Sequence, residues 1–384
     1  MKPKITFLPL SGADTIDANC YFLQLGQNNI LLDCGSANDH GLIHGPNFNV
    51  LLKSGLVHSL EEITHVFISH AHMDHVGYLP QLLGLLPNAT VFMTPITELL
   101  TRYQLFNHSC DIPKGQGEAQ VVLEDLLSRI RLVNFLETVD FGTFRVSFYQ
   151  AGHIPGAMMC LFSYQGKRIL YTGDYSFEDS VLTQGCLVPE GIKPDALLMC
   201  ATNAHNPTYR RFENALLHRC QGVLQLVAQG KNVFCSVNQL SKGLEILSML
   251  NHLCSEQGLR VPIYLDEHML SLVQQLEQLG IPLMAEHNFL LQYGKKLVPH
   301  ITLAQDNNSR ADADEIRVNV DFTLHDDYEE MKSFIRKLNP SKVVLVHCGA
   351  AYPGESSLEE ELVWDPDCHS QLCYGQNGIV YRLF

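Results

Sequence analysis

The residues best suited to chemistry in this chain are the histidines and aspartate of one short segment. Three imidazoles and one carboxylate fall within six residues, at His70, His72, Asp74 and His75. Imidazole nitrogen and carboxylate oxygen suit zinc, and the lack of cysteine in the segment favours a catalytic over a sealed structural site. Alternate side chains of such a loop can point at two different ions. The segment therefore predicts a catalytic metal centre.

Two predicted elements flank this segment. The apolar run at 64–69 predicts a buried strand, and the pattern at 78–86 predicts a helix. A ligand loop between a strand and a helix is the order expected of an enzyme that layers helices on sheets. Surface histidines without a function are the alternative, but they would need no such placement. We therefore expect the ligands at the carboxyl end of a strand.

Other predicted strands also end near polar residues. Asp33 closes a strand at 20–33, and His153 and Asp174 each follow a later strand. Taken alone, each is more often a turn residue whose hydrogen bonds are satisfied. The remaining strands of this region are predicted at 5–10, 144–149, 158–164, 168–171 and 196–200.

The pattern changes in the second half of the chain. Residues 205–320 alternate helices and strands, which predicts a small parallel sheet with helices around it. A helix at 328–338 and a buried strand at 342–347 then return to the style of the first part. We expect an α+β fold in which residues 1–204 and 321–384 form one domain and 205–320 form an inserted α/β lobe.

Composition and charge limit the classes of function. Apolar residues make up 46%, and no stretch approaches the ~20 apolar residues of a membrane span. The chain starts without a signal peptide, and its 12 cysteines form no CxxC pair, so we expect a cytoplasmic protein with reduced thiols. A net charge of -15 disfavours a broad basic face for nucleic acid, so any such contact should be local. Self-association into a homo-oligomer stays open.

Four segments, in order, resemble the signatures of the metallo-β-lactamase superfamily. They are residues 31–35 around Asp33, the HxHxDH motif at 70–75, residues 151–157 around His153 and residues 171–175 around Asp174. The resemblance implies an αββα sandwich that binds two zinc ions, or manganese or iron in their place. It also implies a hydroxide shared by the two metals as the nucleophile, with its pKa lowered toward neutrality.

The same resemblance implies a role for each residue. The ligands expected are His70, His72 and His153 for one ion, Asp74 and His75 for the other, and Asp174 for both. Asp74 and Asp174 are thereby also expected among the catalytic residues. Asp33 would accept the second N–H of a ligand histidine and so fix its orientation.

The last third of the chain resembles the β-CASP branch of this superfamily, whose members cut nucleic acid. Residues 320–327 resemble the branch's FSxHxD signature, and residues 343–349 resemble its VHG signature. The resemblance implies that His347 completes the second metal site, as in RNA-cutting members. It also implies that His325 contacts the scissile phosphate and assists the leaving oxygen, a role suited to an imidazole with an ordinary pKa of ~6.5.

Two positions depart from that branch. Cys200 stands where the branch carries a glutamate that would orient His325. Ser241 and Lys242 stand where a Gly-Arg pair would open a helix of the inserted lobe, so Lys242 keeps one cation and is expected to bind substrate. The chain therefore resembles a shortened and divergent member.

Three functions are compatible with these features. The first is a two-metal phosphodiesterase that cleaves nucleic acid, RNA above all. The second is a two-zinc hydrolase of a small ester, thioester or phosphodiester, which the acidic charge and short insertion favour. The third is a non-catalytic scaffold in an RNA-processing complex, which the complete ligand set disfavours.

Overall fold

The chain forms two compact units, and each is described by itself. The computed structural model describes residues 3–39, 42–107, 116–208, 214–237, 240–281, 283, 289–292, 297–304, 312, 314–320, 322–349, 358 and 369–384. The first unit comprises Met1–Glu178, Gln184–Arg210 and His325–Phe384, and the second comprises Asp179–Thr183 and Arg211–Leu324. None of the helices in these ranges combines the length and the hydrophobicity that a membrane-spanning helix needs.

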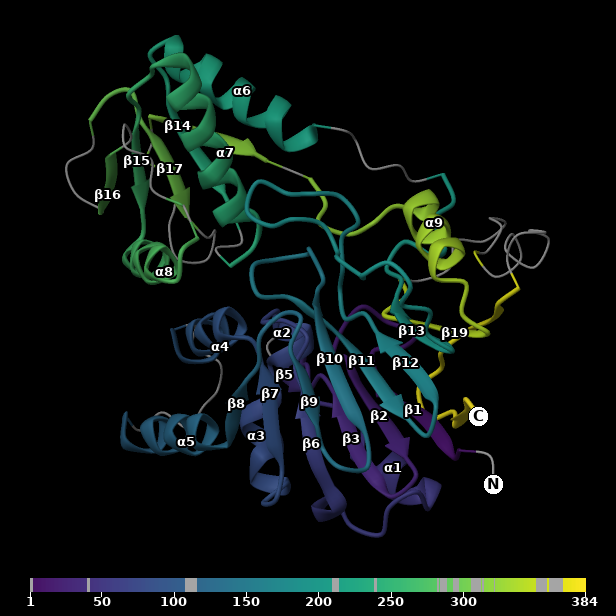
Figure 1. Ribbon diagram of the computed structural model, residues 1–384. Helices are drawn as coiled ribbons and strands as arrows, with labels where there is room; N and C mark the ends of the chain where they lie inside the picture. The colour runs from purple at the N-terminus through teal and green to yellow at the C-terminus, as the bar shows by residue number, and fades with distance from the viewer. Residues whose placement is uncertain are drawn as a thin grey trace. The chain divides into compact units, whose positions relative to one another are not determined.

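The first sheet of the first unit has seven strands (Figure 1). In spatial order they are β21 (Tyr381–Arg382), β1 (Ile5–Ser11), β2 (Cys20–Leu25), β3 (Asn28–Leu32), β6 (Ile63–Phe67), β7 (Thr90–Met93) and β8 (Ile130–Leu132). The single strand predicted at 20–33 is two strands, because the chain turns back at Gly26, whose φ of 64° suits glycine. β3 and β6 run parallel, so both end at the same edge of the sheet.

The second sheet also has seven strands and takes in the C-terminal region. In spatial order they are β20 (Gln371–Tyr374), β19 (Lys342–Val346), β13 (Ala196–Cys200), β12 (Lys167–Tyr171), β11 (Met158–Tyr164), β10 (Arg145–Gln150) and β9 (Thr138–Asp140). β11 is antiparallel to both of its neighbours, and β13 is parallel to β12 and to β19. It follows that β10, β12, β13 and β19 all run in the same direction.

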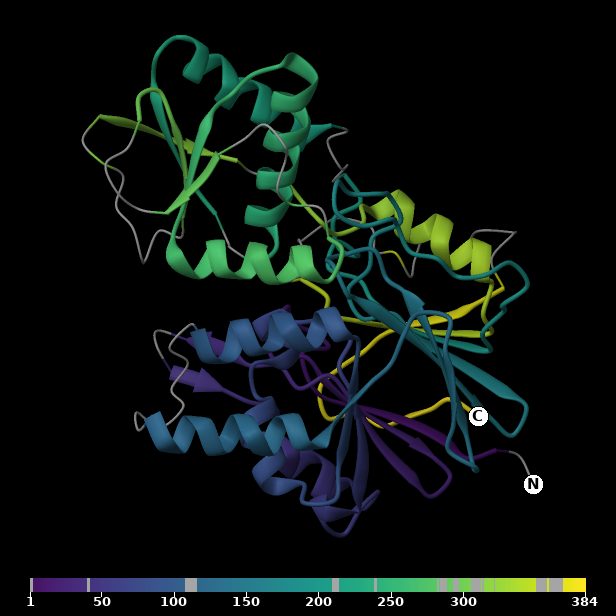
Figure 2. The same ribbon diagram turned by 60° about the vertical axis from the view of Figure 1, so that its left-hand side comes forward.

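The two sheets face each other across an apolar core (Figure 2). Phe67 of the first sheet meets Phe162 of the second edge to face, with ring centroids 5.2 Å apart. The outer face of the first sheet is covered by α1 (Phe48–Ser54), α2 (Met73–Val76), α3 (Leu79–Leu85) and α5 (Gln116–Arg129). On the second sheet, Phe334 of α9 (Tyr328–Leu338) stacks on Tyr175 at 4.8 Å. The layers are helix, sheet, sheet, helix, which is the predicted αββα sandwich.

The second unit is built on five parallel strands. In spatial order they are β16 (Phe289–Gln292), β15 (Pro262–Leu265), β17 (Ile301–Ala304), β14 (Asn232–Ser236) and β18 (Glu315–Asn319). Val233, Phe234 and Cys235 are fully buried in succession, as in a parallel strand covered on both faces. The helices of this unit are α6 (Ala215–Ala228), α7 (Lys242–Gln257) and α8 (Glu267–Gln278).

Candidate metal centre

The predicted site residues of the first unit lie where strands end. His70 and His72 follow β6, His153 follows β10, and Asp174 follows β12. His347 comes directly after β19. Because β10, β12 and β19 run in the same direction, their carboxyl ends meet at one edge of the second sheet. Side chains that are far apart in the sequence are brought together there.

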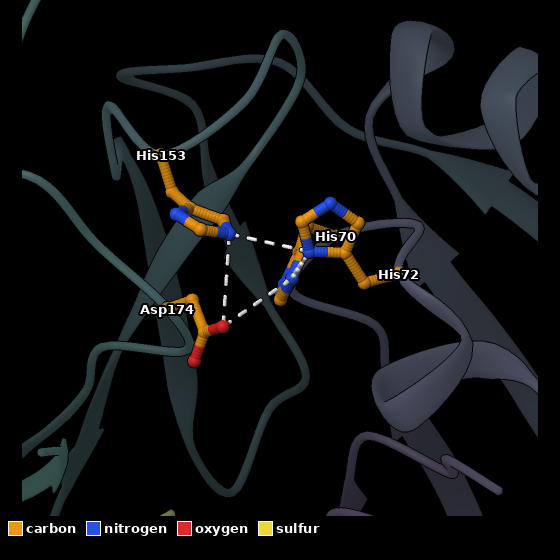
Figure 3. A group of neighbouring side chains, drawn as sticks. All are labelled: His70, His72, His153 and Asp174. Atoms are coloured by element: carbon orange, nitrogen blue, oxygen red, sulfur yellow. Dashed lines mark hydrogen bonds and ion pairs between the residues drawn. The ribbon is translucent and has the colours of Figure 1, made fainter. Parts of the chain in front are cut away.

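Four ligand atoms converge in the first of two clusters (Figure 3). His72 Nδ1 lies 3.0 Å from His70 Nε2 and 3.2 Å from His153 Nε2. Asp174 Oδ2 lies 3.7 Å from His70 Nε2 and 3.6 Å from His153 Nε2. Ligands that surround zinc tetrahedrally at ~2.0 to 2.1 Å lie about 3.3 Å from one another. The four atoms therefore have the spacing that a zinc-sized ion requires.

The second cluster shares Asp174 with the first and adds Asp74, His75 and His347. His75 Nε2 lies 3.3 Å from Asp74 Oδ2 and 3.4 Å from Asp174 Oδ1. His347 Nε2 lies 3.8 Å and 3.6 Å from the same two oxygens. Oδ2 of Asp174 thus faces the first cluster and Oδ1 faces the second. In this arrangement one carboxylate can bridge two ions.

The donor atoms of both clusters fit divalent metal ions. Asp174 Oδ1 is buried and accepts no hydrogen bond from the described part of the chain. A buried oxygen without a hydrogen bond needs another partner, and a cation is one. Nitrogen and oxygen donors of this kind hold zinc, manganese or iron.

The crowding of rings and carboxylates shifts pKa values in the metal-free protein. Burial above all lowers the pKa of His72 to about 3 and lowers the pKa of His70 well below its ordinary value. Burial also opposes a charge on His75, but Asp174 and Asp74 outweigh it and raise the pKa of His75 well above its ordinary value. A metal ion binds the neutral ring, so two of these histidines are ready to bind and His75 must first release a proton.

Asp33 lies behind His75 and outside both clusters. Its Oδ2 lies 2.8 Å from His75 Nδ1 and accepts the hydroxyl of Ser69 at 2.7 Å. The hydroxyl of Tyr171 donates to the same oxygen. An ionised carboxylate accepts only, so Nδ1 of His75 keeps its proton, and the proton that a metal ion must displace is the one on Nε2, which faces the second cluster. The structure thus places Asp33 against the outer nitrogen of a ring whose other nitrogen faces Asp74.

Asn19 is a further residue of this region that the sequence patterns do not single out. It is fully buried before β2, and its amide contacts Asp74, His75 and His347. The one feature of the sequence that could have pointed to Asn19 is its position, as an amide directly before the strand β2, whose six residues are all buried. Ser69 and Tyr171, whose hydroxyls donate to Asp33, were also not singled out, because each lies at the end of an apolar run.

His325 faces the first cluster without belonging to it. Its Nδ1 lies 3.9 Å from Asp174 Oδ2, and its ring centroid lies 4.7 Å from that of His153. Its side chain is 31% exposed, so the ring also borders solvent. Desolvation of the ring, with repulsion from His153 and His347, lowers the pKa of His325 to about 3 despite the attraction of Asp174. In the metal-free protein the pKa of His325 thus lies below the ordinary value expected from the sequence, because the ring is desolvated and stands among other imidazoles.

A small cavity lies beside His325, where the branch would place its glutamate. Its lining includes Asp174, Cys200, Thr202 and His325. The Thr202 hydroxyl is buried and makes no hydrogen bond within the described residues. Burial raises the pKa of the Cys200 thiol well above its ordinary value, so it cannot replace the charge of a carboxylate.

Lys242 belongs to the second unit, where it is the first residue of α7. Its ammonium lies 5.5 Å from the centroid of the Phe322 ring. Glu245, one turn further on, accepts the hydroxyl of Ser180 at 2.6 Å and the backbone N–H of Val181 at 3.2 Å. Burial raises the pKa of Glu245. Within this unit the carboxylate therefore ties a short segment to α7.

Comparison with known proteins identifies the family. Residues 13–198 match the sequence model of the family described as the Metallo-beta-lactamase superfamily. This part of the chain belongs to the metallo-β-lactamase superfamily. Its two His and Asp clusters are typical of the dinuclear metal site of this superfamily. Both conclusions agree with the signatures found in the sequence.

Curated relatives extend the likeness beyond the matched region. Endoribonuclease ysh1 of Emericella nidulans is 28% identical over 274 residues, which are 68% of this chain and 30% of that protein. Cleavage and polyadenylation specificity factor 73 of Drosophila melanogaster is 30% identical over 265 residues, which are 67% of this chain and 37% of that protein. The chain thus spans about a third of the length of these relatives. The predicted distant homology to β-CASP endoribonucleases is confirmed.

A solved structure supports the fold. A crystal structure of a protein of unknown function from Enterococcus faecalis is 16% identical, with a TM-score of 0.65 over 99% of this chain and 100% of that chain. At this identity the likeness concerns the fold alone. The predicted sandwich with an additional α/β sheet is confirmed.

Proposed function

We propose that this chain is a two-metal phosphodiesterase that hydrolyses nucleic acid, RNA in particular. The ions proposed are zinc, with manganese or iron able to use the same nitrogen and oxygen ligands. The ligands proposed are His70, His72 and His153 for the first ion, Asp74, His75 and His347 for the second, and Asp174 as the bridge. Lys242 is proposed to contact substrate.

The observation that carries this proposal is the position of His325. Both clusters have their ligands without it, yet its ring faces Asp174 at 3.9 Å and lies beside His153. An activated small ester loses its leaving group without a proton, so its hydrolysis gives such a ring little to do. An alkoxide that leaves phosphorus does need a proton or a hydrogen bond, and an imidazole at this place can supply it. The arrangement supports a phosphodiesterase.

The residues divide the work of the reaction. Two ions held by the clusters would lower the pKa of water toward neutrality and so supply the nucleophile. Asp174 keeps the two clusters in register, because its two oxygens face opposite sides. Asp33 keeps the Nε2 lone pair of His75 turned toward the second cluster. The chain thereby prepares the ligands before any substrate arrives.

His325 is neutral at pH 7 in the free protein, because its pKa is lowered to about 3. The negative charge of a phosphodiester beside the ring favours the protonated form and so raises this pKa. In that form His325 can bind the phosphate and donate a proton or a hydrogen bond to the leaving oxygen.

The RNA assignment is supported by the names of relatives. Two fungal relatives are named endoribonucleases, and their identity of 28 to 29% covers 68% of this chain. Because this chain spans about a third of their length, their substrate is carried over only as a proposal.

A hydrolase of small esters or phosphodiesters is the second proposal. The net charge of -15 disfavours a long anionic polymer. The cavity beside His325 also has the Cys200 thiol where the branch has a carboxylate. These two features favour a small substrate.

The test is an assay of the purified, zinc-loaded protein on labelled RNA, single-stranded DNA and bis-nitrophenyl phosphate. We expect two ions per chain by elemental analysis and cleavage of RNA. Asp174→Ala should lose metal and activity together, because a bridging ligand has no substitute. The assay is repeated with the protein loaded with manganese or iron. If bis-nitrophenyl phosphate is cleaved but RNA stays intact with all three metals, the proposal of a small substrate replaces the proposal of a ribonuclease.

A further inference from the structure

The amide of Asn19 lies against three of the four members of the second cluster. Its Nδ2 lies 3.2 Å from Asp74 Oδ2 and 3.1 Å from His75 Nε2. Its Oδ1 lies 2.9 Å from His347 Nδ1. The side chain is fully buried, so no water competes freely for these contacts. Asn19 is therefore placed to act on the ligands of the second ion.

The neighbours decide which way the amide points. The Asp74 carboxylate only accepts hydrogen bonds, so the amide nitrogen must face it. The amide oxygen then faces His347 Nδ1, which must donate, and it also accepts the hydroxyl of Tyr21 at 2.6 Å. His347 therefore carries its proton on Nδ1. Its Nε2 lone pair is left facing Asp74 and Asp174, at 3.8 Å and 3.6 Å.

Backbone contacts keep Asn19 and His347 in this relation. The N–H of Asn19 donates to the carbonyl of Asp74 at 2.7 Å, and the N–H of His347 donates to the carbonyl of Gly12 at 2.9 Å. His347 has a φ of 55°, which a non-glycine residue adopts only where the surroundings hold it. A Cβ at Gly12 would lie 2.6 Å from the Cα of Asn19. The backbone at position 12 can therefore approach Asn19 this closely only because residue 12 is a glycine.

We propose that Asn19 is the positioning residue of the second cluster. It selects the tautomer of His347 with its amide oxygen and holds the Asp74 carboxylate with its amide nitrogen, so that the second ion finds both ligands oriented. The inference rests on the proposed two-metal function. Loss of such a partner behind or beside the ligands typically costs 10–100-fold in metal affinity.

The first test is Asn19→Leu, which has a similar volume and no hydrogen-bonding atoms. Metal-free protein is titrated with zinc by calorimetry, and bound zinc is counted after dialysis. We expect the wild type to keep two ions and the variant to keep one. The zinc affinity of the second cluster should fall 10–100-fold, and that of the first cluster should stay unchanged.

Asn29→Leu is the matched control. Asn29 is also a buried asparagine of the first sheet, 6% exposed, but its amide bonds Gln24 and the carbonyl of Glu62. This variant should lose stability and still keep two ions. Asn19→Ser, whose side chain is too short to reach His347, serves as a milder second variant in case the leucine prevents folding. Circular dichroism of the metal-free proteins reports the fold.

A folded Asn19→Leu or Asn19→Ser protein that holds two ions with wild-type affinity would overturn the inference. The readout uses no substrate, so it separates this inference from the proposed reaction. A wild type that binds two ions and leaves RNA intact, while the Asn19 variants bind one, would contradict the ribonuclease proposal and support the role of Asn19.

Discussion

At the scale of single residues, Asp174 and His325 lie 3.9 Å apart but differ in what they contact. Asp174 belongs to both clusters, so its removal disturbs both sets of ligands. His325 belongs to neither cluster and can be removed without taking a ligand away. Variants of the two residues therefore test the proposed metal binding and the proposed assistance to the leaving group separately.

His325→Ala should leave metal content unchanged and lower the turnover number on RNA by ~10²- to 10⁴-fold, the usual contribution of a general acid or base. A nitrophenyl ester should suffer least, because its leaving group is weakly basic. Steady-state kinetics with elemental analysis of the same samples checks this. RNA cleavage at the wild-type rate across pH 6 to 8 would remove His325 from the mechanism.

His70 gives the metal-free protein a pH-dependent stability. Its folded-state pKa lies well below the ~6.5 of an unfolded histidine, because the ring is fully buried. Between these two values the unfolded chain binds a proton that the folded chain does not, so stability falls as the pH falls below ~6.5. His75 acts with the opposite sign: its stabilisation is complete below ~6.5 and is lost as the pH rises through its raised pKa.

We therefore expect chelator-treated wild type to lose stability between pH 7 and pH 5, and His70→Gln to lose less over the same range. Urea denaturation midpoints at each pH measure the difference. An equal loss in both proteins would show that His70 does not carry this dependence.

At the scale of elements, one aspartate joins the loop after β12 to the segment before α9. Asp326 Oδ1 accepts the backbone N–H of Phe177 at 2.7 Å, and its carbonyl accepts the side-chain amide of Asn203 at 2.7 Å. Asp326 adjoins His325, and Phe177 lies three residues after Asp174. The contact thus links the loop that carries the bridging carboxylate to the segment that carries His325.

Asp326→Ala should cost ~1 to 3 kcal/mol of stability, because it leaves a partly buried N–H without its acceptor. Turnover should also fall, while Asp326→Asn, which keeps the accepting oxygen, should stay close to wild type.

Asp327→Ala is the control: Asp327 caps α9 through Glu329 and Glu330, so its loss should cost ~0.5 to 2 kcal/mol with little change in turnover. Thermal melts and kinetics of the three variants decide. Equal turnover in Asp326→Ala and Asp327→Ala would contradict the link.

At the scale of the whole molecule, the charge balance limits how the proposed RNA substrate could be held. A net charge of -15 disfavours a broad basic face that neutralises many phosphates, so binding of RNA should depend only weakly on salt. Lys242→Ala should raise KM for RNA several-fold and leave hydrolysis of bis-nitrophenyl phosphate unchanged. Lys231→Ala, at an exposed lysine of the same unit, is the control. Kinetics at several salt concentrations test this, and an equal KM for RNA in wild type and Lys242→Ala would refute it.

Much of the fold could be predicted from local patterns. The helix predicted at 328–338 has the bounds of α9, because Asp327 and Glu330 form a capping box at its start and Asn339 adopts a left-handed φ of 41° at its end. The predicted strand at 20–33 was wrong, since the apolar run continues through a turn that only Gly26 marks. Periodicity detects burial well, but it does not detect a tight turn inside a buried run.

The residues of both clusters could be predicted from the sequence, because six consecutive residues carry four of the donors and each remaining donor follows a strand. The protonation of those donors and the contacts that support them could not be predicted, because they depend on residues from distant parts of the chain. Asn19 and His347 are 328 residues apart, and no pattern along the chain relates them. The pKa of His325 depends likewise on rings that arrive from other strands. Ligand type is a property of the residue, whereas tautomer, pKa and orientation arise from contacts that exist only once the two sheets have packed.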